Sequence, residues 1–136
     1  MIQQVEFSLQ SHRKGFHLIT PQVVRYLPEL PDKGLLNLFI KHTSAGLGIN
    51  ENADPDVRQD LESIFNRLVK EQETYYTHTL EGADDMPAHA KSILVGASIN
   101  IPIRDGRLDM GMWQGIYLCE FRNDGGNRQI VATIIS

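Results

Sequence analysis

Hydrophobic and polar residues alternate at the start of the chain. Val5, Phe7 and Leu9 occupy every second position, with polar residues between them. Because successive side chains of a strand point to opposite faces, this period of two predicts a half-buried β-strand. Residues 16–19 predict a second strand. The apolar run at residues 35–40 predicts a central strand that is covered on both faces.

Three segments have the pattern of helices. A threonine and a proline at residues 20–21 predict a short helix that ends before Pro28. The clearest helix spans about residues 54–70, where Asp54 is the expected cap. A stripe of apolar residues at helical spacing predicts that this helix packs on the core: Val57, Leu61, Ile64, Phe65, Leu68 and Val69. A shorter helix is expected from near Pro87 to Gly96.

The last third of the chain is rich in β patterns. Isoleucines alternate at residues 99–103, and the Asp-Gly pair at residues 105–106 suits a tight hairpin turn. Residues 115–122 and 128–135 predict another strand pair, and residues 75–79 are a further candidate strand. Together these elements predict a mainly β fold of the α+β class, an antiparallel two-sheet sandwich with about two flanking helices.

Composition narrows the class of protein. The 136 residues are 41% hydrophobic and 22% charged, without a repeat or linker, so a single domain over residues 1–136 is expected. A formal net charge of −4 argues against nucleic acid and anionic membranes as partners. The one cysteine, Cys119, favours a reducing compartment, and no signal peptide or membrane span is evident. A cytoplasmic location is therefore expected.

Three of the five histidines lie at the ends of predicted elements. His42 follows the predicted central strand, His78 precedes an acidic segment, and His89 lies in the first turn of a helix. Three imidazoles and a water form a common open zinc site, so these residues are candidate ligands for a divalent metal ion. Their spacing matches no local motif, and isolated histidines that form hydrogen bonds are the alternative.

Carboxylates near these histidines are candidate catalytic groups. No helical periodicity requires a charge at Glu51, Asp84 or Asp85. Such groups orient a ligand imidazole or act as general acid and base. Six other polar or aromatic residues are candidates for contact with a small-molecule ligand: Thr43, Ser44, Asn50, Trp113, Gln114 and Arg128. A phosphate could be held by any of four arginines, Arg104, Arg107, Arg122 or Arg128, and the sequence leaves that choice open.

Several of these segments together resemble the YjbQ family, and the resemblance runs from end to end. They are residues 15–18, 42–45, 50–52, 54–55, 81–87, 106–108, 113–115 and 125–126, together with His89, Lys91, Gly111 and Arg128. The resemblance implies a sandwich of antiparallel strands, a homotrimer, and a pocket that gathers His42, His78 and His89 around a metal, with zinc the first candidate.

The same resemblance implies a weak thiamine phosphate synthase activity. On that basis we expect an enzyme, a metal-assisted transferase or hydrolase that acts on a small phosphorylated or heterocyclic metabolite. Glu51, Asp84 and Asp85 are then the expected catalytic residues. The alternative is a trimer that binds a metal or a metabolite without catalysis.

Overall fold

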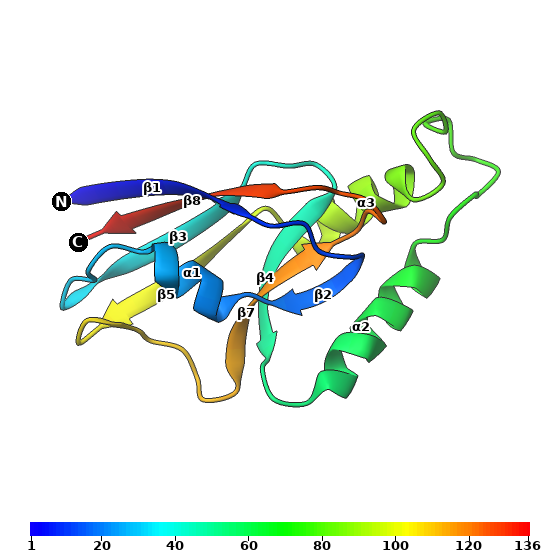
Figure 1. Ribbon diagram of the computed structural model, residues 1–136. Coiled ribbons are helices and arrows are strands. Elements are labelled where there is room, and N and C mark those ends of the chain that lie inside the picture. The colour runs from blue at the N-terminus through cyan, green and yellow to red at the C-terminus, as the bar shows by residue number, and fades with distance from the viewer.

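The computed structural model describes residues 1–136 and divides the strands between two antiparallel sheets (Figure 1). The larger sheet has five strands in the order β1-β8-β3-β5-β6, and the smaller has three in the order β2-β7-β4. The strands are β1 Ile2–Leu9, β2 Gly15–Leu18, β3 Lys33–Ile40, β4 Ala45–Glu51, β5 Ser98–Arg104, β6 Arg107–Leu108, β7 Gln114–Glu120 and β8 Arg128–Ile135. The predicted mainly β fold of the α+β class is confirmed.

Three helices accompany the sheets, at the three segments with helical patterns: α1 Thr20–Tyr26, α2 Pro55–Leu68 and α3 Asp85–Val95. The start of α2 follows its sequence signal, because the Asp54 carboxylate accepts the backbone N–H of Asp56 at 2.9 Å. At α1 the helix forms as predicted, but Thr20 does not have the capping role that its sequence position suggested. Its hydroxyl accepts the N–H of Ile116 at 2.8 Å. None of the three helices is long and apolar enough to cross a membrane.

The smaller sheet is buried on both faces. Alternation along β7 places Ile116 and Leu118 in the main core between the sheets, a cluster of sixteen buried residues. The other face of β7 carries Tyr117 and Cys119 into a second cluster, which residues of α2 and α3 cover. Figure 1 shows these two helices on the side of the small sheet that faces away from the large one. Burial raises the pKa of the Cys119 thiol to about 12, so this cysteine is an inert core residue.

Two predictions about the strands are wrong. Residues 115–122 and 128–135 do not pair with each other, because β7 pairs with β2 and β4 whereas β8 pairs with β1 and β3. The glycine-rich connection between them carries the chain from one sheet to the other. Residues 75–79 form no strand and have no strand partner. There the hydroxyl of Tyr76 donates a hydrogen bond to the carbonyl of Lys70 at 2.5 Å.

The central strand β3 is covered on one face and not on both as predicted. Leu36, Leu38 and Ile40 point into the core and are almost completely buried. Leu35 and Phe39 point outward and are 37% and 45% exposed. The apolar run therefore has side chains on both faces of the strand, but only one of these faces packs against the core.

The apolar stripe of α2 is likewise divided. Leu61 and Phe65 pack against the second core cluster, but no residue of α2 is completely buried. Ile64 and Leu68 are 58% and 65% exposed, so the prediction that the whole stripe packs on the core is wrong.

A buried ion pair joins the two sheets where β7 ends and β8 begins. Arg128 donates from Nε to Oε1 of Glu120 at 2.8 Å and from Nη2 to Oε2 at 2.5 Å. Nη2 also donates to the hydroxyl of Ser44 at 3.0 Å. Both charged side chains are almost completely buried. A Cβ at Gly125 would lie 2.6 Å from the arginine and from the carboxylate, so only glycine fits beside the pair.

We predict that the substitution Arg128→Met lowers the free energy of unfolding by about 3–5 kcal/mol, because it leaves the Glu120 carboxylate buried without a partner. The double substitution Arg128→Met, Glu120→Met removes both charges and is expected to destabilise less than Arg128→Met alone. Urea unfolding of the wild type, the single variants Arg128→Met and Glu120→Met, and the double variant measures this. A double variant at least as unstable as the sum of its single variants would contradict the pairing.

Candidate functional site

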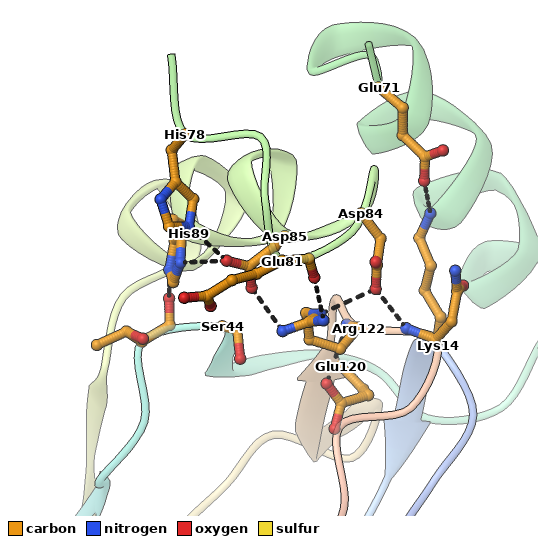
Figure 2. A network of polar contacts seen from close by, with 12 residues as sticks. Lys14, Ser44, Glu71, His78, Glu81, Asp84, Asp85, His89, Glu120 and Arg122 are labelled. Atoms are coloured by element: carbon orange, nitrogen blue, oxygen red, sulfur yellow. Dashed lines mark hydrogen bonds and ion pairs between the residues drawn. The ribbon is translucent and has the colours of Figure 1, made fainter. Parts of the chain in front are cut away.

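A loop and the first turns of α3 bring two histidines onto one carboxylate (Figure 2). Asp85 begins α3, and His89 follows one turn later on the same face of the helix. His78 comes from the preceding loop. The Nε2 atoms of His78 and His89 lie 2.6 and 3.0 Å from Oδ2 of Asp85. All three potential ligand atoms lie within 4.8 Å of one another. We call these three residues the His-Asp-His cluster.

Arg122, just beyond the end of β7, holds the carboxylates of this region in place. Its Nη1 donates to Oδ1 of Asp85 at 2.5 Å, and its Nε donates to Oδ2 of Asp84 at 2.9 Å. Its Nη2 donates to the carbonyl of Glu81 at 3.0 Å. The guanidinium therefore fixes one oxygen of Asp85 and leaves the other facing the histidines, as Figure 2 shows.

The two aspartates are ionised although they are buried. Burial acts to raise the pKa of Asp85, but the hydrogen bond from His78 and the charges of His89 and Arg122 outweigh it and hold the pKa below its ordinary value. Burial acts on Asp84 in the same way. There the backbone N–H of Asn123 and the guanidinium of Arg122 lower the pKa. The His-Asp-His cluster thus contains a permanent negative charge at neutral pH.

The hydrogen bond on the far side of His89 determines which of its nitrogens carries a proton. Nδ1 lies 2.9 Å from the carbonyl oxygen of Thr43, which can only accept, so Nδ1 is protonated and donates. In a neutral ring Nε2 then carries a lone pair, and this lone pair faces an oxygen of Asp85 that also only accepts. Two acceptors at 3.0 Å repel each other unless a proton or a cation lies between them.

His42 is not part of the cluster. Its Nε2 accepts the backbone N–H of Gln129 at 2.8 Å, so its lone pair is engaged by strand β8. Burial, together with the nearby charge of Arg128, lowers the pKa of His42. The structure thus gathers two of the three predicted histidines, and the third group is an aspartate.

Glu51 and Asn50 also lie outside the cluster. Oε2 of Glu51 accepts the N–H groups of Ala53 and Asp54 at 2.6 and 3.1 Å, and Oδ1 of Asn50 accepts the N–H of Glu51 at 2.7 Å. These side chains shape the turn that leads into α2.

The other predicted ligand-binding residues are spread over the molecule. Thr43 reaches the cluster through its backbone carbonyl. Ser44 and Arg128 belong to the buried ion pair. Trp113 is 62% exposed, and Gln114 accepts the N–H of Gly111 at 2.8 Å near the opposite end of β7 from Arg122.

The roles of Arg122 and Lys91 could not be predicted from the sequence. Lys91 is 1% exposed, donates to Oδ1 of Asn66 at 2.8 Å and lies 5.9 Å from the centre of the Phe121 ring. Burial, with the charge of Lys14 adding to it, lowers the pKa of Lys91 to about 8. A single lysine in a helix gives no signal of burial, because lysine side chains are rarely buried. Its place among the segments that resemble the family was the only hint.

Comparisons with known proteins identify relatives along the whole chain. A family model described as "UPF0047 protein YjbQ-like" matches residues 5–136. The UPF0047 protein YjbQ of Escherichia coli O157:H7 is 46% identical over 133 residues, which cover 96% of each chain. A conserved hypothetical protein from Thermus thermophilus has a solved structure that is 35% identical, covers 97% of this chain and 99% of its own, and superposes with a TM-score of 0.82.

These findings overturn the expected activity. A solved structure from Sulfolobus solfataricus, with a TM-score of 0.85 and 22% identity over 100% of this chain and 98% of its own, is described as a YbjQ-like protein of unknown function, and its likeness shows the fold alone. Neither the family description nor the names of the relatives carry an activity. The prediction of a metal-assisted enzyme with thiamine phosphate synthase activity is therefore wrong. What the match over residues 5–136 does show is that the chain belongs to the UPF0047 YjbQ-like family.

Proposed function

We propose that the His-Asp-His cluster binds a divalent transition-metal ion, with zinc as the first candidate. The observation that carries the proposal is the pair of facing acceptors, Nε2 of His89 and Oδ2 of Asp85, 3.0 Å apart. A cation that accepts electron pairs from both atoms, and from His78, removes the repulsion between them. Imidazole nitrogen and carboxylate oxygen are both ordinary zinc ligands.

The groups around the cluster support this proposal. Metal-bound histidines usually donate their other N–H to a carbonyl or carboxylate, which fixes the ring, and Thr43 accepts from His89 in this way. Arg122 orients the carboxylate of Asp85 from its other oxygen. The side chain of His78 is 43% exposed, so the cluster opens to solvent on that side. Three protein ligands and one open position suit a tetrahedral ion that also holds a water.

A second proton on His89 is the competing occupant. An imidazolium donates from Nε2 to Asp85, and the distances of 2.6 and 3.0 Å suit hydrogen bonds. Metal binding would displace these protons and move the three ligand atoms slightly apart, since zinc lies about 2.0–2.2 Å from each nitrogen or oxygen. Dialysis distinguishes the two possibilities, because a metal ion at the cluster remains bound and a proton leaves no metal to detect.

We predict near-stoichiometric zinc in the wild-type protein after incubation with zinc and dialysis, measured by elemental analysis. His78→Gln removes one ligand at an exposed position, where folding is least affected, and is expected to weaken zinc binding at least tenfold. His42→Gln is the matched control, because His42 lies outside the cluster, and it is expected to retain the metal. Circular dichroism confirms that both variants are folded.

Two results would contradict the metal proposal. One is a wild-type protein that keeps no zinc, which would leave a proton as the occupant of the cluster. The other is loss of zinc in His42→Gln with retention in His78→Gln, which would place the metal at the other histidine.

We also propose that the chain assembles as a homotrimer through the outer face of the large sheet. Leu35 and Ile135 are partners in the register of β3 and β8, and both are exposed, at 37% and 47%. Phe39, 45% exposed, lies further along the same face. Apolar side chains that line up across neighbouring strands on an uncovered face are typical of a protein–protein interface.

A cytoplasmic location, favoured by the single cysteine, stays a prediction.

Phe39→Lys is expected to shift the protein from trimer to monomer, because it places a charge in the proposed interface. Light scattering coupled to size-exclusion chromatography measures the molar mass. Ile64→Lys is the control, since this residue is equally apolar and 58% exposed but lies on α2. A trimer that survives Phe39→Lys and dissociates with Ile64→Lys would assign assembly to the helix instead, and a monomeric wild type would refute the trimer.

A further inference from the structure

A polar hollow of about 830 Å³ lies between β2 and α2, apart from the His-Asp-His cluster. The chain segment from His12 to Leu18 forms one wall, and one face of α2, from Pro55 to Asn66, forms the other. A second hollow of about 1020 Å³ shares His12 and Leu18 with it and extends toward α1. The first hollow alone has the volume of a usual small-molecule site.

The charge of this region is opposite to that of the protein as a whole. The chain carries a formal net charge of −4, yet Arg13 and Arg58 line the first hollow and Arg25 lines the second. Glu62 lines the first hollow and is its only acidic residue, and the second hollow has none. Burial lowers the pKa of Lys91, and the negative charge of Glu62 opposes part of that shift, so Glu62 also acts on this buried lysine.

The arginines of the first hollow have no acceptors within the protein. Arg104, Arg122 and Arg128 each form an ion pair with a carboxylate. Neither Arg13 nor Arg58 forms an ion pair or a side-chain hydrogen bond. Nη1 of Arg58 is buried and has no hydrogen-bond partner, and it is the only buried side-chain nitrogen or oxygen atom in this condition. A buried guanidinium N–H without an acceptor is unfavourable for the fold. The Arg58 side chain as a whole is only half-buried and lines the hollow, so it lies within reach of a ligand there.

The wall that carries Arg13 is held in place. His17 donates from Nε2 to the carbonyl of Arg13 at 2.7 Å, because that oxygen can only accept. His12 bonds in the same way through Nδ1 to the carbonyl of Gln10 at 2.8 Å, and the two imidazole rings lie 4.8 Å apart. A site whose walls are fixed before binding loses less conformational entropy when the ligand enters.

We propose that this hollow binds a small molecule through a doubly charged oxyanion group, which Arg13 and Arg58 contact. A guanidinium presents N–H donors in a planar fork that matches two oxygens of a phosphate or a carboxylate. The volume exceeds the size of such a group, so the remainder of the ligand lies along the hollow, where Phe16 and Leu18 supply apolar surface. The proposal involves no residue of the His-Asp-His cluster.

The first measurement compares stability without any ligand. Arg58→Met removes the guanidinium, including its buried Nη1, and keeps most of the side chain's volume. Because the lost N–H has no acceptor, we expect this variant to unfold at the same temperature as the wild type or above it. Arg67→Met is the matched control on the same helix, at an exposed position that does not line either hollow. A lower unfolding temperature for Arg58→Met than for Arg67→Met would mean that the guanidinium has a structural partner, which would overturn the proposal.

The second measurement is binding, by titration calorimetry on protein freed of metal with a chelator. Inorganic phosphate and malonate are the probes, and chloride at equal ionic strength is the blank. We expect at least one probe to bind the wild type, Arg58→Met to bind it at least tenfold more weakly, and Arg67→Met and His78→Gln to bind it unchanged. Phosphate binding alone identifies a tetrahedral group, and malonate binding alone identifies a dicarboxylate. No binding of either, or equal binding in Arg58→Met, would refute the site.

Discussion

The burial of β7 on both faces is the constraint on which the rest of the structure depends. Ile116 and Leu118 point to the large sheet while Tyr117 and Cys119 point to α2 and α3. This one strand therefore fixes the spacing of the large sheet, the small sheet and the helices. A shift of its register by one residue would turn the side chains of each cluster toward the opposite face. Gln114 begins this strand and Arg122 lies just beyond its other end, so the two residues are at opposite ends of it.

Charged groups gather around the C-terminal end of β7. Glu120 pairs with Arg128, and Arg122 pairs with Asp84 and Asp85, while Lys91 lies against Phe121. Burial of each charge is unfavourable unless it is paired and hydrogen-bonded, and here each carboxylate has an arginine. This compensation leaves one oxygen of Asp85 for the histidines. The geometry of the proposed metal site is thus a consequence of how the buried charges are paired.

The polar hollow between β2 and α2 belongs to the same architecture. Leu61 and Phe65 are the apolar residues of α2 that pack on the second core cluster, and polar residues of the same helix line the hollow beside β2. Arg58 faces that space from the helix and Arg13 from the segment before β2. Neither arginine gives a signal in the sequence, since surface arginines without partners are common and the two lie far apart along the chain.

The fold class, most strand positions and the start of α2 could be predicted from the sequence, because these follow from side-chain periodicity and from local hydrogen bonds such as that of Asp54. The sequence also determined which histidines and aspartates were candidates. Tertiary structure alone decided which of them meet: His42 gives its lone pair to the backbone of β8, and Asp85 takes its place beside His78 and His89. It also decided that β7 and β8 belong to different sheets. Periodicity records which face of an element is apolar, but pairing between distant segments depends on packing that no local pattern contains.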